Sequence, residues 1–133
     1  MVALISHRLL APRLLTTSFL KHAKARMTSG TQAKNSFLVL IDDFTDAEAL
    51  SRRLQARVHH LSEAIKKRLV GQLVSGGAIL DSHKTGKMVG SALVLNADSA
   101  EEVVEILKSD PYTVGRAWDM DSVRIYPYRE AQF

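Results

Sequence analysis

The sequence contains no cysteine among its 133 residues. This absence excludes a disulfide scaffold, a thiolate zinc site, an iron–sulfur cluster and a cysteine nucleophile. Aromatic residues make up only 6%, and no stretch approaches the roughly 18 consecutive apolar residues of a membrane span. Arg8, Arg13, Lys21 and Lys24 interrupt the apolar run near the N-terminus. We therefore expect one ordinary soluble domain that is not integral to a membrane.

Acidic residues are absent before Asp42, and this absence explains the overall charge. Residues 1–41 carry six positive charges: Arg8, Arg13, Lys21, Lys24, Arg26 and Lys34. The whole chain has a net charge of +4, so residues 42–133 have a net charge of −2. A basic chain would ordinarily suggest an anionic partner such as nucleic acid. Here the excess positive charge belongs to the first residues and not to the domain.

Residues 1–34 have the composition of a targeting segment. They combine Arg and Lys with Ser, Thr, Leu and Ala and lack acidic residues, which is typical of a mitochondrial presequence. The alternatives are a disordered basic tail or translation from Met27, and either would leave the protein cytoplasmic. We assign residues 1–34 as this leader and residues 35–133 as the folded domain.

The first half of the domain predicts a strand followed by a long helix. Residues 37–41 (FLVLI) form a short apolar run typical of a buried strand. Thr45 and Glu48 have the spacing of a capping box, and Gly71 is suited to end the helix. Apolar residues recur at helical spacing between these points, at Leu50, Leu54, Val58, Leu61, Ile65 and Leu69. This pattern predicts an amphipathic helix whose other face is solvated and basic.

The second half predicts two more strands, a helix and a last strand. Residues 72–80 form a strand in which Gly76-Gly77 indicates a bulge or a close approach, and residues 81–87 form a loop. Residues 88–97 form the third strand. Ser99 and Glu102 repeat the capping-box spacing before a helix that must end near Asp110-Pro111. Apolar and polar residues alternate over residues 122–128, which predicts a fourth strand.

This order of elements predicts an α+β fold, the ferredoxin-like βαββαβ plait. Short connections and right-handed crossovers give a four-stranded antiparallel sheet with both helices on one face. The opposite face then needs a cover. A second copy of the chain is the simplest cover, so we expect a homodimer of the dimeric α/β barrel type.

Three kinds of partner are disfavoured by the residues present. Modules that read RNA on this fold need aromatic residues on the third strand, which has none, so we expect no nucleic acid. The glycines fit no phosphate-binding motif, so we expect no cofactor. His60, Asp81 and His83 could supply two histidines and a carboxylate, but their spacing matches no metal motif, so we expect no metal.

Several short motifs together resemble the YCII-related family, and the segments GGAILD and AWDMDSV resemble its fungal-type members. The resemblance covers about residues 36–130, and the matching pieces are Arg57, His60 and Leu61; Gly76-Gly77 with Asp81; Gly90-Ser91; and Asp110-Pro111-Tyr112. It implies a dimer with a cleft between sheet and helices, and a histidine–aspartate active site that corresponds here to His60 and Asp81. In such a pair a neutral imidazole accepts a proton while the carboxylate fixes its tautomer.

The expected function is therefore binding of a small organic molecule. Proton transfer by His60 and Asp81 would make the protein an isomerase, a lyase or a dehalogenase, whereas the alternative is a non-catalytic ligand-binding or structural homodimer. We expect the substrate to contact Arg57, Gly77, Ser91 and Tyr112. Two of these assignments have structural alternatives, because Arg57 could pair with Glu63 or another surface acid and Tyr112 could line a dimer contact. For Trp118, core packing is expected.

Overall fold

The structure is a computed structural model that describes residues 34–133. The predicted leader lies almost entirely outside the described residues. The sheet consists of β1 (Asn35–Asp42), β2 (Leu73–Leu80), β3 (Met88–Ala97) and β4 (Arg124–Tyr128). The helices are α2 (Ala49–Leu69), α3 (Ala100–Lys108) and the one-turn α4 (Pro111–Val114), and the 3-10 turn η1 (Met120–Ser122) precedes β4.

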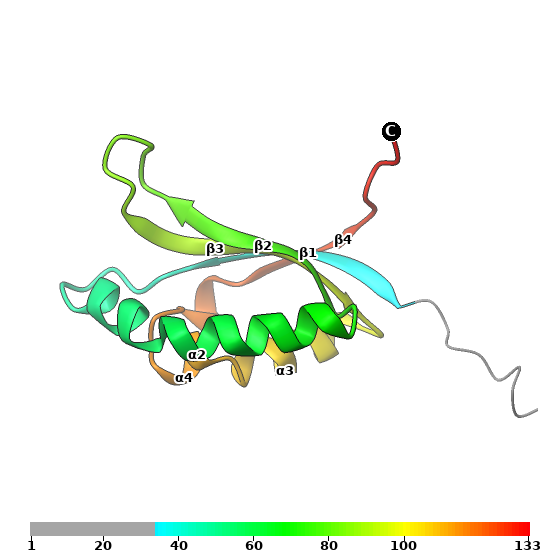
Figure 1. Cartoon of the computed structure of the whole chain (residues 1–133), viewed down its shortest axis with the longest axis horizontal. Helices are drawn as coiled ribbons and strands as arrows, with labels where there is room; N and C mark the ends of the chain where they lie inside the picture. Colours follow the sequence, from blue (N-terminus) through cyan, green and yellow to red (C-terminus); the bar gives the residue numbers. More distant parts are fainter. Residues whose placement is uncertain (1–33) are drawn as a thin grey trace, which may run out of the picture. The chain divides into compact units, whose positions relative to one another are not determined.

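The strands are arranged in the order β2-β3-β1-β4, and every neighbouring pair is antiparallel. The helices all lie on one face of this sheet, and within the described part of the chain no helix covers the other face (Figure 1). The predicted ferredoxin-like plait is therefore confirmed. None of the helices in residues 34–133 is long and apolar enough to cross a membrane.

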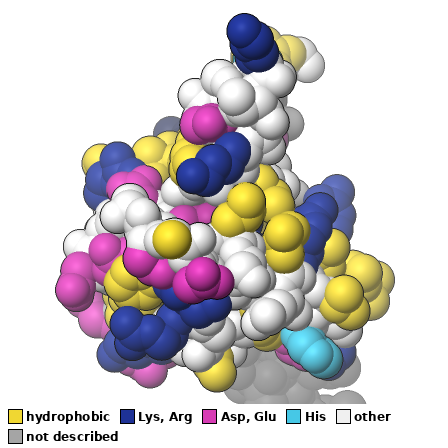
Figure 2. All heavy atoms as spheres, turned by 90° about the vertical axis from the view of Figure 1, so that its left-hand side faces the viewer, with side chains coloured by type: hydrophobic (Ala, Val, Ile, Leu, Met, Phe, Trp, Pro, Cys, Tyr) yellow, Lys and Arg dark blue, Asp and Glu magenta, His cyan; other side chains and the backbone are white. Residues whose placement is uncertain are grey.

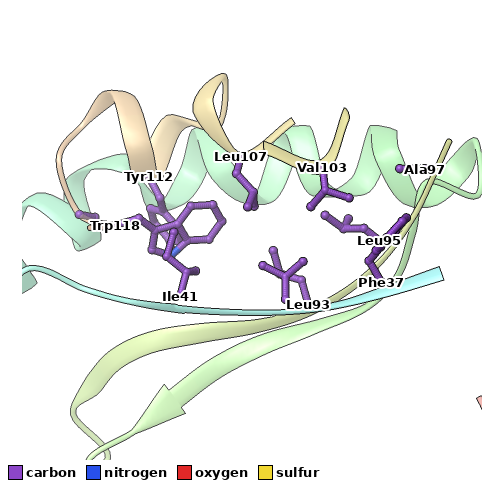
Figure 3. Close-up of a cluster of buried hydrophobic side chains, with 11 residues drawn as sticks. Phe37, Ile41, Leu93, Leu95, Ala97, Val103, Leu107, Tyr112 and Trp118 are labelled. Atoms are coloured by element: carbon purple, nitrogen blue, oxygen red, sulfur yellow. The ribbon is translucent and has the colours of Figure 1, made fainter. Parts of the chain in front are cut away.

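The core lies between the sheet and the helices, because alternate residues of the two central strands point to the same side. Val39 and Ile41 of β1 are fully buried there, and so is Leu95 of β3, the cross-strand partner of Phe37. Val103 and Leu107 of α3 close this core from the helix side, and Tyr112 and Trp118 fill the end nearest Ile41 (Figure 3). Trp118 is 1% exposed, which confirms its predicted place in the core.

The caps explain where the helices begin and end. Ser99 accepts the Glu102 N–H at 3.1 Å, and the Glu102 carboxylate accepts the Asp98 N–H at 2.6 Å, so the predicted cap of α3 is confirmed. The prediction for α2 was wrong, because this helix is preceded by Glu48 with no side-chain cap. Instead, Asp46 accepts the Glu48 N–H at 3.1 Å. Gly71, with a φ of 74°, ends α2 as predicted.

The apolar stripe of α2 points away from the core, contrary to the prediction from its periodicity. Five of its six residues are exposed by 44% to 82%: Leu54, Val58, Leu61, Ile65 and Leu69. Leu50 is half-buried, and Leu61 also borders the cavity described below. The face toward the sheet instead carries Arg53, Ala56, His60 and Ala64. The small alanine side chains leave space beneath the helix, and Arg53 and His60 make that space polar at one end. The helix thus contributes polar groups to the interior.

Basic and acidic side chains are mixed on the surface of the domain. Figure 2 shows one end of the molecule, where Lys and Arg groups stand beside Asp and Glu groups and apolar patches lie between them. The domain also has ion pairs at its surface, among them Arg52 with Asp46 and Lys66 with Glu63. This face shows no continuous basic patch of the kind that binds a phosphate backbone.

Candidate functional site

A cavity of about 260 Å³ lies between α2 and the β2–β3 side of the sheet. Its walls are mostly apolar and come from Leu61, Leu73, Met88, Leu93, Leu95, Ile106 and Leu107. Polar side chains gather at part of its surface: Arg53, His60, Ser91, Asp110 and Tyr112. Apolar walls with a few convergent polar groups are the usual form of a small-molecule site.

His60 and Asp110 form the central pair of this cluster. The His60 Nδ1 lies 2.7 Å from the Asp110 Oδ1, and the two side chains are only 12% and 8% exposed. A carboxylate accepts a hydrogen bond and cannot donate one when ionised, so Nδ1 carries the proton. This tautomer leaves a lone pair on Nε2, which makes no hydrogen bond within residues 34–133. The pair therefore has the arrangement of a general base with its orienting carboxylate.

Asp110 is held in place by the start of α4. Its Oδ1 also accepts the Tyr112 N–H at 2.9 Å, which makes Asp110 the N-cap of this turn. Pro111 occupies the first position of the turn, where a missing N–H costs nothing. The Asp-Pro-Tyr sequence thus builds a rigid turn that aims one carboxylate oxygen at α2.

Tyr112 packs against the face of His60. The two rings are stacked with centroids 3.8 Å apart and an interplanar angle of 16°, and the Arg53 guanidinium lies 4.5 Å from the tyrosine ring centroid. Burial raises the pKa of Tyr112, although the nearby charges of Arg53 and Arg57 oppose this shift. The phenol therefore stays protonated at neutral pH. Tyr112 lines the cavity, in agreement with its expected place at the site.

Behind the cavity lies a buried network around Arg53. The guanidinium is 2% exposed and donates to Asp43 at 2.6 Å and to Ser91 at 3.0 Å. Trp118 also donates to Ser91, at 3.1 Å. Burial raises the pKa of Asp43, and the charge of Arg53 opposes this effect. Two buried atoms of the pair, Asp43 Oδ2 and Arg53 Nε, have no hydrogen-bond partner in the described structure.

Ser91 reaches the network because Gly90 lets β3 approach β1. A Cβ at Gly90 would lie 2.6 Å from the Ile41 carbonyl oxygen, which no side chain can tolerate. The glycine thus permits the register in which Ser91 faces the helices and the cavity. Ser91 had been expected to contact the substrate, and its place in the lining is compatible with that role.

Two further cations lie along the cavity. Arg57 and Lys67 both line it, and neither forms an ion pair within the described residues. Glu63, the partner considered for Arg57, pairs instead with Lys66 at 2.6 Å. Gly77 also belongs to the lining. All four residues expected to contact the substrate therefore border the same cavity.

Asp81 does not pair with His60. The carboxylate beside His60 therefore differs from the one that the resemblance implied. Asp81 is exposed in the loop after β2, where its Oδ1 accepts from Ser82 N–H, from the Thr85 hydroxyl and from Lys87 N–H. These bonds, that from Thr85 above all, lower the pKa of Asp81. The carboxylate thus closes its own loop, and Asp110 takes the position beside His60.

The roles of Asp110 and Arg53 were not predicted, although a sequence pattern points to each of them. Asp110-Pro111 has the form of a helix N-cap followed by an N1 proline, but it was interpreted as the end of a helix and as part of the resemblance, without a role for the carboxylate. Arg53 lies seven residues before His60 and therefore shares its face of α2. Within residues 34–133 the structure contains no group of three His, Asp or Glu side chains arranged to hold a metal ion.

Comparison with known proteins gives relatives in fungal biosynthesis. No family model matches the chain. The derivative of benzaldehyde biosynthesis cluster protein C of Emericella nidulans is 35% identical over 78 residues, which cover 55% of this chain and 80% of that protein. The chain belongs to this family of fungal biosynthesis cluster proteins.

Other relatives in this family match a longer part of the chain. Aspercryptin biosynthesis cluster protein B of Emericella nidulans is 33% identical over 101 residues, 72% of this chain, and the match spans 64% of that protein's length. Fusaric acid biosynthesis protein 2 of Gibberella fujikuroi is 29% identical over 97 residues, which cover 70% of this chain and 91% of that protein. These three relatives are all named for small-molecule biosynthesis.

A solved structure shows the same fold. The 5-chloro-2-hydroxyhydroquinone dehydrochlorinase of Burkholderia phenoliruptrix matches with a TM-score of 0.60 and 21% identity, over 72% of this chain and 95% of that chain. At this identity the likeness establishes the fold alone. It agrees with the ferredoxin-like α+β architecture described above.

Proposed function

We propose that this protein binds a small organic metabolite in the cavity and moves a proton on it with His60. The observation that carries the proposal is the hydrogen bond of 2.7 Å between His60 Nδ1 and Asp110 Oδ1. This bond leaves the Nε2 lone pair free, and His60 lines a cavity whose walls are mostly apolar. Proton transfer of this kind serves isomerisation and elimination alike.

The relatives support a small-molecule role without specifying the reaction. The family members are named for biosynthesis of aspercryptin, fusaric acid and a benzaldehyde derivative. The fold neighbour is named a dehydrochlorinase, and its structure was solved with 2,5-dihydroxybenzoquinone. The resemblance to YCII-related proteins points in the same direction, with Asp110 in place of Asp81 as the partner of His60.

The test is a pair of matched histidine variants. Lactones and aromatic acids are first screened by thermal shift, and compounds that raise the melting temperature are assayed for turnover. We expect His60→Gln to reduce kcat by about 100-fold to 10,000-fold, the usual contribution of a general base. His59→Gln is the control, because His59 is the next residue on α2 and is exposed. Equal kcat in the wild type and in His60→Gln would refute the proposal, and binding without any turnover would assign a binding protein instead.

We also propose that a second copy covers the outer face of the sheet. Leu38 and Val94 are cross-strand partners on this face, and Tyr126, opposite Leu38, is 48% exposed. Covering such a face is a common reason for a two-fold dimer. We expect light scattering to give twice the chain mass, and Val94→Lys to give the monomer mass. Val58→Lys, on the exposed stripe of α2, is the control and should remain dimeric; a wild-type monomer would refute the proposal.

A further inference from the structure

The hydroxyl of Ser91 has both of its acceptor positions filled. It accepts from Arg53 Nη2 at 3.0 Å and from Trp118 Nε1 at 3.1 Å. A guanidinium and an indole N–H can only donate. A hydroxyl oxygen has two lone pairs, and these two bonds use both of them. Ser91 therefore has only its own proton left with which to make a further hydrogen bond.

That proton has no acceptor within residues 34–133, although Ser91 is 2% exposed. Buried polar groups are almost always paired, so an unpaired donor in a native structure requires an explanation. Ser91 lines the cavity together with His60. The free donor is therefore available to a molecule bound there.

We propose that Ser91 donates its hydrogen bond to a carbonyl oxygen of the substrate and holds that oxygen as negative charge develops on it. The inference rests on the proposed proton transfer by His60. When His60 Nε2 takes a proton from the carbon beside the carbonyl, the C–H electron pair forms the C=C bond of an enolate and the carbonyl pair moves to oxygen. His60 then returns the proton to another carbon, or a leaving group departs with its electron pair. Ser91 keeps its own proton throughout.

The charged and polar groups around Ser91 would stabilise negative charge on the substrate oxygen. Arg53 donates directly to the Ser91 oxygen, so its positive charge strengthens the hydroxyl as a donor. Tyr112 adds a second protonated hydroxyl at the cavity. Asp110, the one carboxylate among the described lining residues, is already bonded to His60. The substrate class is thus a small ketone, enone or quinone with a removable proton next to its carbonyl group, and donors placed at the oxygen stabilise its enolate.

The first test needs no substrate, because the chain contains no cysteine. Ser91→Cys introduces a single thiol that receives the same two donors, and its ionisation is followed by ultraviolet absorbance. We expect its pKa to lie at least about one unit below the value of about 8.5 for a free thiol. Ser75→Cys, on the exposed part of β2, supplies the matched control. A thiol at position 91 with a pKa equal to or above that of the control would overturn the inference.

The second test measures preference for a bound oxyanion with 4-nitrophenol, whose ionised form is coloured. We expect the wild type to bind the phenolate in preference to the phenol, and Ser91→Ala to lose about 10-fold to 100-fold of this preference, as for a hydrogen bond to a charged group. Ser75→Ala should retain it, and Ser91→Thr, which keeps the hydroxyl, should restore it. Failure of the wild type to bind the phenolate, or an unchanged preference in Ser91→Ala, would contradict the inference.

The two proposals fail in different ways. If His60 moves no proton, His60→Gln leaves turnover unchanged while the phenolate preference still depends on Ser91. If Ser91 holds no oxyanion, its variants leave the phenolate preference unchanged while His60→Gln still abolishes turnover.

Discussion

Replacement of Arg53 by methionine should remove a large part of the stability of the domain. The Arg53 and Asp43 side chains are 3% and 5% exposed, and their charged atoms lie 2.6 Å apart. At an effective dielectric constant near 20, two charges about 4 Å apart attract by about 4 kcal/mol. Arg53→Met leaves Asp43 as an unpaired buried carboxylate, whose pKa burial already raises. We expect a loss of about 3 to 5 kcal/mol, the usual result of breaking a buried pair from one side.

The measurement is urea unfolding followed by circular dichroism, with a slope of about 1 to 3 kcal/mol per molar expected for a domain of this size. The double variant Arg53→Met with Asp43→Leu should be more stable than Arg53→Met alone, because it no longer buries an unpaired charge. Arg52→Met is the control: this half-buried neighbour pairs with the exposed Asp46 at the surface, and its loss should matter much less. A cost below about 1 kcal/mol for Arg53→Met, or strict additivity in the double variant, would refute this reasoning.

Three further predictions concern single side chains. Asp110→Asn should retain the cap of α4 but lose the charge beside His60, so nitrogen NMR should show a mixed His60 tautomer while the unfolding midpoint changes little. Ser99→Ala should lower the free energy of unfolding by about 1 kcal/mol through loss of the α3 cap, as measured in urea. The hydrogen bond from Arg52 lowers the pKa of Asp46 from 3.8 to about 2, so this pair adds stability above pH 3.8 that disappears as the pH falls through 2. The melting temperatures of the wild type and Asp46→Asn should therefore converge between pH 4 and pH 2, and a constant difference would contradict this assignment.

The strands and their order could be predicted because alternation and short apolar runs depend on local sequence. Residues 37–41 and 88–97 fall inside or coincide with β1 and β3, and right-handed connections then leave few topologies. The sheet was therefore accessible from pattern alone. The same holds for the Ser99 cap, whose bonds are made within four residues.

The orientation of α2 could not be predicted, because periodicity identifies an apolar stripe without saying what faces it. The stripe of Leu54, Val58 and Ile65 is exposed, and the inner face instead carries Arg53 and His60. The inward polar groups pair with partners far away in the sequence, Arg53 with Asp43 and Ser91 and His60 with Asp110, so the pattern within the helix does not reveal them.

The carboxylate that pairs with His60 could not be predicted from the sequence either. His60 and Asp110 are 50 positions apart, and Asp81 was the carboxylate that the resemblance implied. Only the placement of α4 decides which carboxylate reaches the imidazole. Spacing along the chain carries no information about that distance.

One oxygen atom of Asp110 has two roles, one in the fold and one at the candidate site. Its Oδ1 caps α4 and also accepts from His60, so a substitution that removes this oxygen damages the turn and the His60–Asp110 pair together. A relative without the proposed proton transfer would still keep an Asp or Asn at this position to preserve the turn. The residue type at position 110 therefore indicates the α4 turn, and by itself it does not indicate proton transfer.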